Sequence, residues 1–392
     1  MKRLFSLLLA LAMVLSMTAC GSTNAPAATE AAKTETPAAT EAAAAEPAAE
    51  PYKIGIVTPT LTISEDEFRG AAEMVEKYPD IVVHKTLPED YQNKEGCISV
   101  VTSLADDPQM KYILFNMGME GILPAFQTIR EKRPDIVTIV TSNDDPALMN
   151  KYVDISLNTD WVRRGVTIPT KAHEMGAKTF IHYSFPTHMA SESKVQRRDA
   201  MKATCEKLGM EFVEVITPDP QTGNGKAAML QFLREDLPRQ VEKYGKDLNI
   251  FGTNCPMYDV ILDEAFKLGF IVAEQCCPTP TQAYPTVLNL EITKEDLGDY
   301  DKINSMIAEK AAAANMTGRL SGWAMPSSVY TPKFQVELAV YMHDNNLTPD
   351  DVRSVAFLNK FSQEHMPVAA DFAVAGEGLD NYFLFILEDV YY

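Results

Sequence analysis

The chain has 392 residues, of which 46% are hydrophobic and 23% are charged, a balance typical of globular proteins. It carries 54 Asp and Glu residues against 35 Lys and Arg residues, so its formal net charge at pH 7 is -19. Because phosphate binding requires a basic face, this acidity argues against a nucleic-acid partner, and it also argues against direct adhesion to anionic lipid.

The chain begins with a short apolar segment. Residues 4–14 form a mostly apolar run that follows Lys2 and Arg3. This run is too short and too early for a comfortable membrane-spanning helix. A basic start, an apolar stretch and a small-residue cleavage site are typical of a secretory signal peptide, which we place at residues 1–19.

Cys20 directly follows Thr18 and Ala19, and this arrangement resembles the lipobox of bacterial lipoproteins, although Met17 stands where that family usually has Leu. The resemblance implies that the Cys20 thiol carries a diacylglyceryl thioether and that the new N-terminus is acylated, for instance with palmitate. We therefore expect a protein that is lipid-anchored at the extracytoplasmic face of the cell membrane. An ordinary signal peptide with an unrelated cysteine is the alternative.

A low-complexity stretch follows the lipobox. Residues 21–51 are almost all Ala, Thr, Glu and Pro, and none is aromatic. Such a segment has no apolar surface to bury, so burial cannot offset the entropy cost of ordering it. We expect residues 20–51 to be a lipidated cysteine followed by an extended, disordered tether.

From residue 52 on, short apolar strands alternate with helical patterns, which predicts a parallel sheet with helices on both faces. This first series forms lobe I, residues 52–158. We expect strands at residues 53–57, 81–83, 112–115, 136–140 and 152–156, and helices at residues 65–77, 97–104 and 122–131.

A second series of the same kind forms lobe II, residues 159–285. We expect helices at residues 161–175, 191–208, 227–244 and 258–268, with Pro238 kinking or splitting the third of these, and strands at residues 179–183, 212–216, 250–252, 270–273 and 287–290. Residues 286–392 are return segments shared between the lobes, with helices at 301–314 and 334–345 and a strand at 382–387. The predicted fold is α/β, with two doubly wound parallel-sheet lobes around a central cleft.

Five cysteines follow Cys20, and no two of them form a C-x-x-C pair. This pattern does not support a zinc site, and we expect neither a metal nor a cofactor. The adjacent Cys276 and Cys277 rarely bridge to each other, because neighbouring positions do not easily meet disulfide geometry. We interpret most of these cysteines as buried small hydrophobes. A disulfide between Cys255 and either Cys276 or Cys277 is the alternative.

Four stretches together resemble the type I periplasmic binding proteins, the fold of ribose- and galactose-binding proteins and of the lac-repressor core. The stretches are residues 58–60 after the opening strand, residues 158–178, residues 197–209 and residues 250–269. The resemblance covers about residues 52–289. One departure is Asn254-Cys255-Pro256-Met257-Tyr258, which lacks the acidic ligand contact usual in that loop. The chain also resembles an uncharacterised lipoprotein branch of this fold.

Open parallel sheets bind ligands beyond the carboxyl ends of their strands, which selects the loops after each predicted strand. Their hydroxyl, amide and aromatic groups suit a neutral polar molecule such as a sugar or nucleoside. Helix capping by the same residue types is the alternative interpretation. The selected residues are Thr58, Thr60, Asn116, Met117, Ser142, Asn143, Asp144, Tyr183, Phe185, Asn254 and Tyr258.

Within this set, Asp144 is the most specific candidate, because either it or Asp145 can accept from a ligand hydroxyl or amine while the other caps a helix at Pro146. We therefore expect Asp144→Ala to lower ligand affinity without unfolding the protein. Trp161 and Arg163 follow the crossing between the lobes, a region that borders the cleft in the resembled family. An arginine there can bind a carboxylate or ring oxygen, although a surface arginine pair is the alternative.

The resemblance implies a solute-binding lipoprotein that captures a small polar ligand for an ABC-type permease and acts as a monomer. A sensor or scaffold that signals to a membrane partner is the first alternative. A lipid-anchored enzyme is the second, but the sequence contains no G-x-S-x-G, H-E-x-x-H or Walker motif, so we expect no catalytic residues. A transcription regulator of this fold is not expected, because a lipidation signal occupies the place of the DNA-binding helices.

Overall fold

The computed structural model describes residues 51–392. The predicted signal peptide, the lipidation site Cys20 and nearly all of the predicted tether lie outside the described residues. Within the described part, no helix combines the length and apolar character that crossing a membrane requires.

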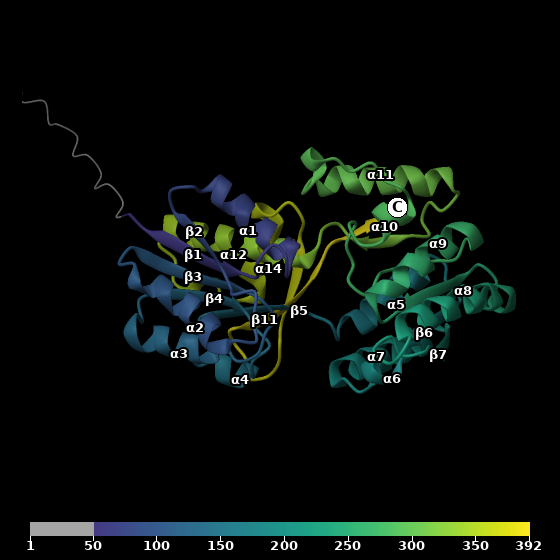
Figure 1. The fold of residues 1–392 in the computed structure, drawn as a ribbon, viewed down its shortest axis with the longest axis horizontal. Coiled ribbons are helices and arrows are strands. Elements are labelled where there is room, and N and C mark those ends of the chain that lie inside the picture. The colour runs from purple at the N-terminus through teal and green to yellow at the C-terminus, as the bar shows by residue number, and fades with distance from the viewer. Residues whose placement is uncertain (1–50) are drawn as a thin grey trace, which may run out of the picture. The chain divides into compact units, whose positions relative to one another are not determined.

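The first sheet has seven strands in the order β10-β11-β5-β4-β3-β1-β2 (Figure 1). Neighbouring strands are parallel except β10 and β11, which form an antiparallel pair at the edge. The strands are β1 (Lys53–Thr58), β2 (Val82–Thr86), β3 (Met110–Asn116), β4 (Val137–Thr141), β5 (Ile155–Thr159), β10 (Ala370–Val374) and β11 (Tyr382–Leu387). This topology confirms the predicted α/β class with a mostly parallel sheet.

Helices cover both faces of the first sheet, which explains why its inner strands β1 and β3 are buried without alternation (Figure 1). Ile54 and Ile56 of β1 pack in one core with Phe334, whereas Val57 packs in the opposite core with Phe126. Around this sheet lie α1 (Glu65–Lys77), α2 (Lys94–Thr102), α3 (Leu123–Lys132), α4 (Pro146–Met149), α12 (Ser327–Asp344), α13 (Pro349–Val352) and α14 (Val355–His365).

The second sheet has the order β7-β6-β8, with all pairs parallel. Single bridges from Asn249 to Ile271 and from Val272 to Leu320 extend it toward the antiparallel pair β9 and β12. The three strands of this sheet are β6 (Thr179–Ser184), β7 (Glu211–Ile216) and β8 (Leu248–Gly252), and the separate antiparallel pair beside it is β9 (Ser321–Trp323) and β12 (Asp389–Tyr391). Its helices are α5 (Arg164–Glu174), α6 (Pro186–Met189), α7 (Glu192–Leu208), α8 (Gly225–Tyr244), α9 (Tyr258–Leu268), α10 (Tyr284–Val287) and α11 (Tyr300–Ala313).

The chain passes three times between the two sheets. It crosses from β5 to α5, returns from β9 to α12, and crosses again from β11 to β12. We call the first sheet with its helices the first lobe and the second sheet with its helices the second lobe. The last crossing uses only a few residues, because β11 ends at Leu387 and β12 begins at Asp389.

Three predicted strands differ from the structure. The strand predicted at residues 152–156 begins three residues later, because the Asp154 carboxylate accepts the Thr138 N–H at 2.8 Å, where strand pairing would otherwise start. The strand predicted at residues 270–273 is reduced to isolated bridges. The strand predicted at residues 287–290 is wrong: Pro285 lies at the start of the short helix α10, and Leu290 N–H closes onto the Pro285 carbonyl.

The helix predicted at residues 227–244 is not split at Pro238. Helix α8 runs through this position without interruption. The return segment also contains a helix, α14, and an edge strand, β10, that the sequence did not predict. The predicted helices at residues 65–77 and 258–268 have the observed bounds.

Candidate ligand-binding cleft

A cleft of about 380 Å³ lies at the carboxyl ends of three neighbouring strands of the first sheet. Asn116, Thr141 and Thr159, the last residues of β3, β4 and β5, all line it. This is where open parallel sheets place their ligands. The remaining lining residues come from α1, from the loops after the strands, from the segment 277–279 of the second lobe and from the start of α12: Asp66, Glu67, Met117, Gly118, Asn143, Asn158, Trp161, Cys277, Pro278, Thr279, Pro326, Ser327, Ser328 and Thr331.

The cleft wall contains polar oxygens that the protein leaves unpaired. Asn116 is 2% exposed and donates its Nδ2 to Gln335 Oε1 at 2.6 Å, which holds the side chain in place. Its Oδ1 has no hydrogen-bond partner among the described residues, and the same is true of Thr141 Oγ1. Because buried polar atoms are nearly always paired, two such atoms at the cleft indicate a place for a ligand's polar groups.

Two carboxylates from the first turn of α1 give the cleft a negative character. Ser328 donates to Asp66 Oδ2 at 2.7 Å, and Ser64 donates to Glu67. Burial raises the pKa of Glu67, against the opposing hydrogen bond from Ser64. Of the described residues that line the cleft, none is Lys, Arg or His. The cleft therefore favours hydroxyl and amine groups and disfavours anions.

Trp161 lies at the crossing from β5 to α5 and is 37% exposed, so its ring is available to a ligand in the cleft. The guanidinium of Arg164 lies 5.1 Å from the centre of this ring and 5.3 Å from that of Trp323. A buried cation over an aromatic ring stabilises the position of that ring. The indole is therefore held in place beside the cleft.

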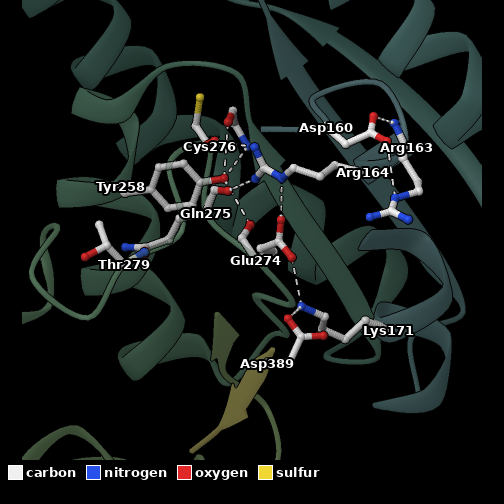
Figure 2. Close-up of polar contacts among 11 residues, drawn as sticks. Asp160, Arg163, Arg164, Lys171, Tyr258, Glu274, Gln275, Cys276, Thr279 and Asp389 are labelled. Atoms are coloured by element: carbon white, nitrogen blue, oxygen red, sulfur yellow. Dashed lines mark hydrogen bonds and ion pairs between the residues drawn. The ribbon is translucent and has the colours of Figure 1, made fainter. Parts of the chain in front are cut away.

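Four charged side chains, three of them buried and Asp389 partly exposed, tie this region together (Figure 2). Arg164 Nε lies 2.6 Å from Glu274 Oε1, and Lys171 Nζ lies 2.8 Å from Glu274 Oε2. Lys171 also pairs with Asp389. Burial opposes the ionisation of Glu274, but the charges of Lys171 and Arg164 outweigh it and hold the pKa of Glu274 below its usual range. The group joins α5, the segment before Cys276, and β12.

Arg164 also fixes the backbone next to the cleft (Figure 2). Its Nη1 donates to the Cys276 carbonyl at 2.8 Å, and its Nη2 donates to the Gln275 carbonyl at 2.6 Å. The Tyr258 hydroxyl donates to the carbonyls of Gly252 and Glu274. The segment that contributes residues 277–279 to the cleft is therefore anchored to α5 and α9.

Asp389 makes the stability of the protein depend on pH. Burial and the nearby Glu274 carboxylate raise its pKa from 3.8 to about 6, although Lys171 acts in the opposite direction. Between these values the unfolded chain has lost a proton that the folded chain still holds, so this contribution to stability falls as pH rises. We expect Asp389→Asn to remove this pH-dependent contribution to stability. As pH rises from 4 to 7, the Tm of wild type should therefore fall relative to the Tm of Asp389→Asn. A difference that is constant with pH would contradict this assignment.

The structure brings together four of the residues that the sequence predicted for the ligand site. Asn116, Met117, Asn143 and Trp161 all line the cleft. Thr58 ends β1 and Thr60 lies two residues beyond it, and neither residue lines the cleft. The Thr58 hydroxyl lies 2.7 Å from His84 Nε2 and donates to the Pro59 carbonyl.

The other predicted residues have structural contacts instead. The Arg163 guanidinium pairs with Asp160 and Asp371, and the neighbouring Arg164 is the buried one. The remaining positions are in the second lobe: Tyr183 donates to Asp236, Phe185 stacks on His188, Tyr258 binds backbone carbonyls, and Asn254 precedes a short 3₁₀ helix, Cys255–Met257.

Asp144 serves the N-terminus of α3 rather than the cleft. Its carboxylate accepts the N–H groups of Gly121, Ile122 and Leu123 at 2.7–3.0 Å and the Ser142 hydroxyl at 3.2 Å. We therefore expect Asp144→Ala to lower the free energy of unfolding by about 1–2 kcal/mol, as loss of a helix cap does. Asp145 caps only the short α4, by accepting the Leu148 N–H, so Asp145→Ala should lower the free energy of unfolding by less. Unfolding in urea measures both variants. Equal losses would show that the three N–H bonds contribute little.

Several cleft residues were not predicted. Asp66 and Glu67 were assigned only to a helix, and Pro326, Ser327, Ser328 and Thr331 lie in the return segment, where the predicted helix began at residue 334 instead of residue 327. Asn158 and Thr159 begin the stretch 158–178 that carried the resemblance to the binding proteins, but they were not predicted as site residues. That pair at the end of an apolar strand was the one available signal.

Comparisons with known proteins agree with this architecture. A crystal structure from Clostridium difficile 630, provisionally described as a transcriptional regulator, is 37% identical, with a TM-score of 0.85 over 87% of this chain and 99% of that one. A sugar ABC transporter structure from Actinomyces odontolyticus is 9% identical, with a TM-score of 0.52 over 86% of this chain and 95% of that one, which is a likeness of fold. The fold is therefore that of the type I periplasmic binding proteins.

Sequence relatives point to a family without an assigned activity. An uncharacterized protein from Treponema pallidum (strain Nichols) is 33% identical over 210 residues, which are 51% of this chain and 89% of the relative. A second uncharacterized protein of the same strain is 32% identical over 168 residues, 43% of this chain and 78% of the relative. Residues 52–321 match the family described as "Protein of unknown function (DUF3798)", and the chain belongs to that family.

Proposed function

We propose that this protein is a lipid-anchored, extracytoplasmic solute-binding protein that captures a small polar molecule and delivers it, as a monomer, to an ABC-type permease. The observation that carries this proposal is the cleft, because its lining joins strand ends of the first lobe to the segment 277–279 of the second lobe. A ligand that contacts both sides stabilises a closed arrangement of the lobes, which is how hinge-closing receptors respond to ligand.

The lining favours a particular ligand chemistry. Asn116 Oδ1 and Thr141 Oγ1 offer unpaired acceptors, and Asp66 adds a carboxylate, whereas the lining contains no cationic side chain. The Trp161 ring offers a flat apolar face for stacking. A hydroxyl-rich molecule such as a sugar or nucleoside fits these groups, and an amine would fit them as well.

The location rests on the N-terminal sequence. The apolar run at residues 4–14 and Cys20 after Thr18-Ala19 support export and lipidation. Detection of a Cys20-linked lipid by mass spectrometry of the membrane fraction tests this part of the proposal. A Cys20→Ala variant should lack the lipid, and the same lipid modification found on that variant would exclude Cys20 as the lipidation site.

Ligand screening by thermal shift tests the binding function. A ligand present at one hundred times its Kd should stabilise the folded protein by about 2.7 kcal/mol, so sugars, nucleosides and polyamines should separate clearly from non-ligands. Carboxylate and phosphate compounds should give no shift, because the charged side chains that line the cleft, Asp66 and Glu67, are both carboxylates. Failure of every polar class would remove the main support for a transport role.

Trp161→Ala is expected to weaken binding of an identified ligand roughly two- to tenfold, the contribution of one aromatic contact. Trp161→Phe should restore most of the affinity, because it restores a stacking face. The matched control is Leu148→Ala, another half-exposed apolar residue that does not line the cleft. Isothermal titration would measure the three variants. An unchanged Kd in Trp161→Ala would place the ligand away from the indole.

A ligand-sensing regulator is the second candidate, favoured by the 37% identical structure that carries this provisional description. A DNA-binding regulator would retard duplex DNA with an affinity that falls steeply with salt. The net charge of -19 works against such binding, so we expect no retardation at low salt, with or without ligand. Salt-dependent retardation would favour the regulator. A sensor that acts on a membrane partner would bind ligand but support no uptake.

A further inference from the structure

Three thiols from two separate segments converge beside the cleft. Cys255 opens the 3₁₀ helix after β8, and Cys276 and Cys277 follow the bridged residues Ile271 and Val272. The three Sγ atoms all lie within 4.8 Å of one another, and those of Cys255 and Cys277 are 3.2 Å apart. All five cysteines of the described residues are free thiols. Cys97 and Cys205 are buried in hydrophobic cores, but these three are partly exposed.

The backbone that carries Cys276 and Cys277 is held from several sides. Arg164 binds the carbonyls of Gln275 and Cys276, and the Gln275 side chain donates to the Gln282 carbonyl at 2.7 Å. Asn249 of β8 accepts the Ala273 N–H at 2.8 Å, which joins the strand before Cys255 to the segment before Cys276. The sulfurs are therefore placed by a rigid scaffold, as a ligand set requires.

One buried cation of the second lobe has no carboxylate partner among the described residues. Glu274 compensates Arg164 and Lys171, but Arg197 is 4% exposed and forms no ion pair with any described carboxylate. Its Nε has no hydrogen-bond partner there, and its guanidinium lies over the Phe251 ring.

We propose that Cys255, Cys276 and Cys277 form a three-thiolate site for a thiophilic divalent cation of the Zn²⁺ type. Tetrahedral Zn–S bonds of about 2.3 Å place sulfurs about 3.8 Å apart, a spacing within the observed cluster. Binding one cation replaces the three thiol protons, which pass to solvent. Three thiolates and a divalent cation carry one net negative charge, which the unpaired Arg197 balances.

The site differs from the ligand cleft but borders it. Cys277 lines the cleft, so a cation held by the three sulfurs would lie beside it. Three protein ligands would leave the fourth tetrahedral position to water or to another group. The three cysteines lack the C-x-x-C spacing usual in zinc sites, because Cys255 and Cys276 come from separate segments of the chain. The parallel bridge between Asn249 and Ile271 brings these two segments side by side. Cation binding by the three thiols requires neither a particular solute nor a transport role.

Competition with a chromophoric chelator measures the site directly in the full chain under a phosphine reductant. We expect one equivalent of Zn²⁺ to bind and its affinity to rise with pH as the thiols lose their protons. Cys276→Ala and Cys277→Ala should each lower the affinity at least tenfold. Cys97→Ala and Cys205→Ala are matched controls, because each removes a buried thiol elsewhere, and they should bind as wild type does.

Cd²⁺ binding supplies a second measurement, which uses the wild-type chain and therefore does not depend on whether a cysteine variant folds. The wild-type chain should develop ultraviolet sulfur-to-cadmium charge-transfer absorption that saturates at one equivalent. No such band, or equal binding by Cys276→Ala and wild type, would overturn the proposal. Alkylation and mass spectrometry of the chain isolated without reductant would detect a Cys255–Cys277 disulfide. Such a disulfide, together with failure of the reduced chain to bind Zn²⁺, would also overturn the proposal. Solute binding is measured in parallel, so that absence of cation binding is distinguished from absence of the proposed solute-binding function.

Discussion

Glu274→Gln is expected to lower the free energy of unfolding by about 3–5 kcal/mol, the loss typical of removing one partner from a buried ion pair. Glu274 is 1% exposed and accepts from both Arg164 and Lys171. The glutamine amide has nearly the same shape but no charge, so two buried cations lose their main counterion. Urea unfolding at neutral pH, followed by circular dichroism, measures the change.

The control for this variant is Asp263→Asn on the surface of α9. Asp263 pairs with Lys267 at 2.7 Å, four residues along the helix, and both side chains are about half exposed. Such a pair contributes about 0.3–0.5 kcal/mol, so the control should remain close to wild type. A loss in Glu274→Gln as small as that in Asp263→Asn would show that the buried cations find other partners.

Gly165→Ala is expected to cost about 1–3 kcal/mol, the range for forcing extra volume into a packed interface. A Cβ at Gly165 would lie 2.5 Å from the Arg197 carbonyl oxygen and 2.6 Å from Ala200 Cβ, so α5 and α7 would have to separate. Because α5 carries Arg164 and α7 carries Arg197, the shift would also disturb the segment beside the cleft. We therefore expect ligand affinity to fall together with stability.

Gly322→Ala in β9 is the matched control, because no atom lies within 4 Å of a Cβ built there. Removing a glycine from an unstrained position restricts the unfolded chain and should leave stability unchanged or raise it by less than about 1 kcal/mol. Chemical unfolding midpoints of the two variants at one pH give the comparison. A Gly165→Ala midpoint equal to that of Gly322→Ala would show that the helices accommodate the methyl group.

Local patterns predicted many elements well, and particular residues show why. Helix α1 has apolar residues on one side and acidic residues in its first turn, and α9 ends at Gly269, which has a φ of +81°. These signals act within a few residues. The strand predicted at residues 287–290 was wrong because its apolar residues are buried by packing on the second lobe, where Leu288 joins the core, and not by pairing in a sheet.

In the candidate site, too, some residues could be predicted from local patterns and others depend on tertiary packing. Asn116, Met117 and Asn143 were predicted because the carboxyl ends of parallel strands meet at one edge of a sheet. Asp66 on α1 and Thr331 on α12 were missed because only the packing of those helices against each other and the sheet brings them to that edge. Arg163 was predicted as a site residue instead of Arg164, because the sequence does not show which of the two neighbouring arginines the start of α5 turns into the core. In the structure Arg164 is buried and Arg163 is partly exposed.

The sequence by itself determined the alternation of buried strands and helices, the α/β class and the strand ends that hold part of the cleft, because these depend on short-range periodicity and on a general property of parallel sheets. Only the tertiary structure decided which thiols meet, which arginine is buried and which return segments close the cleft. Those contacts join residues far apart in the chain, such as Cys255 with Cys277 and Arg164 with Glu274. No local pattern encodes them, because they follow from the packing of whole elements.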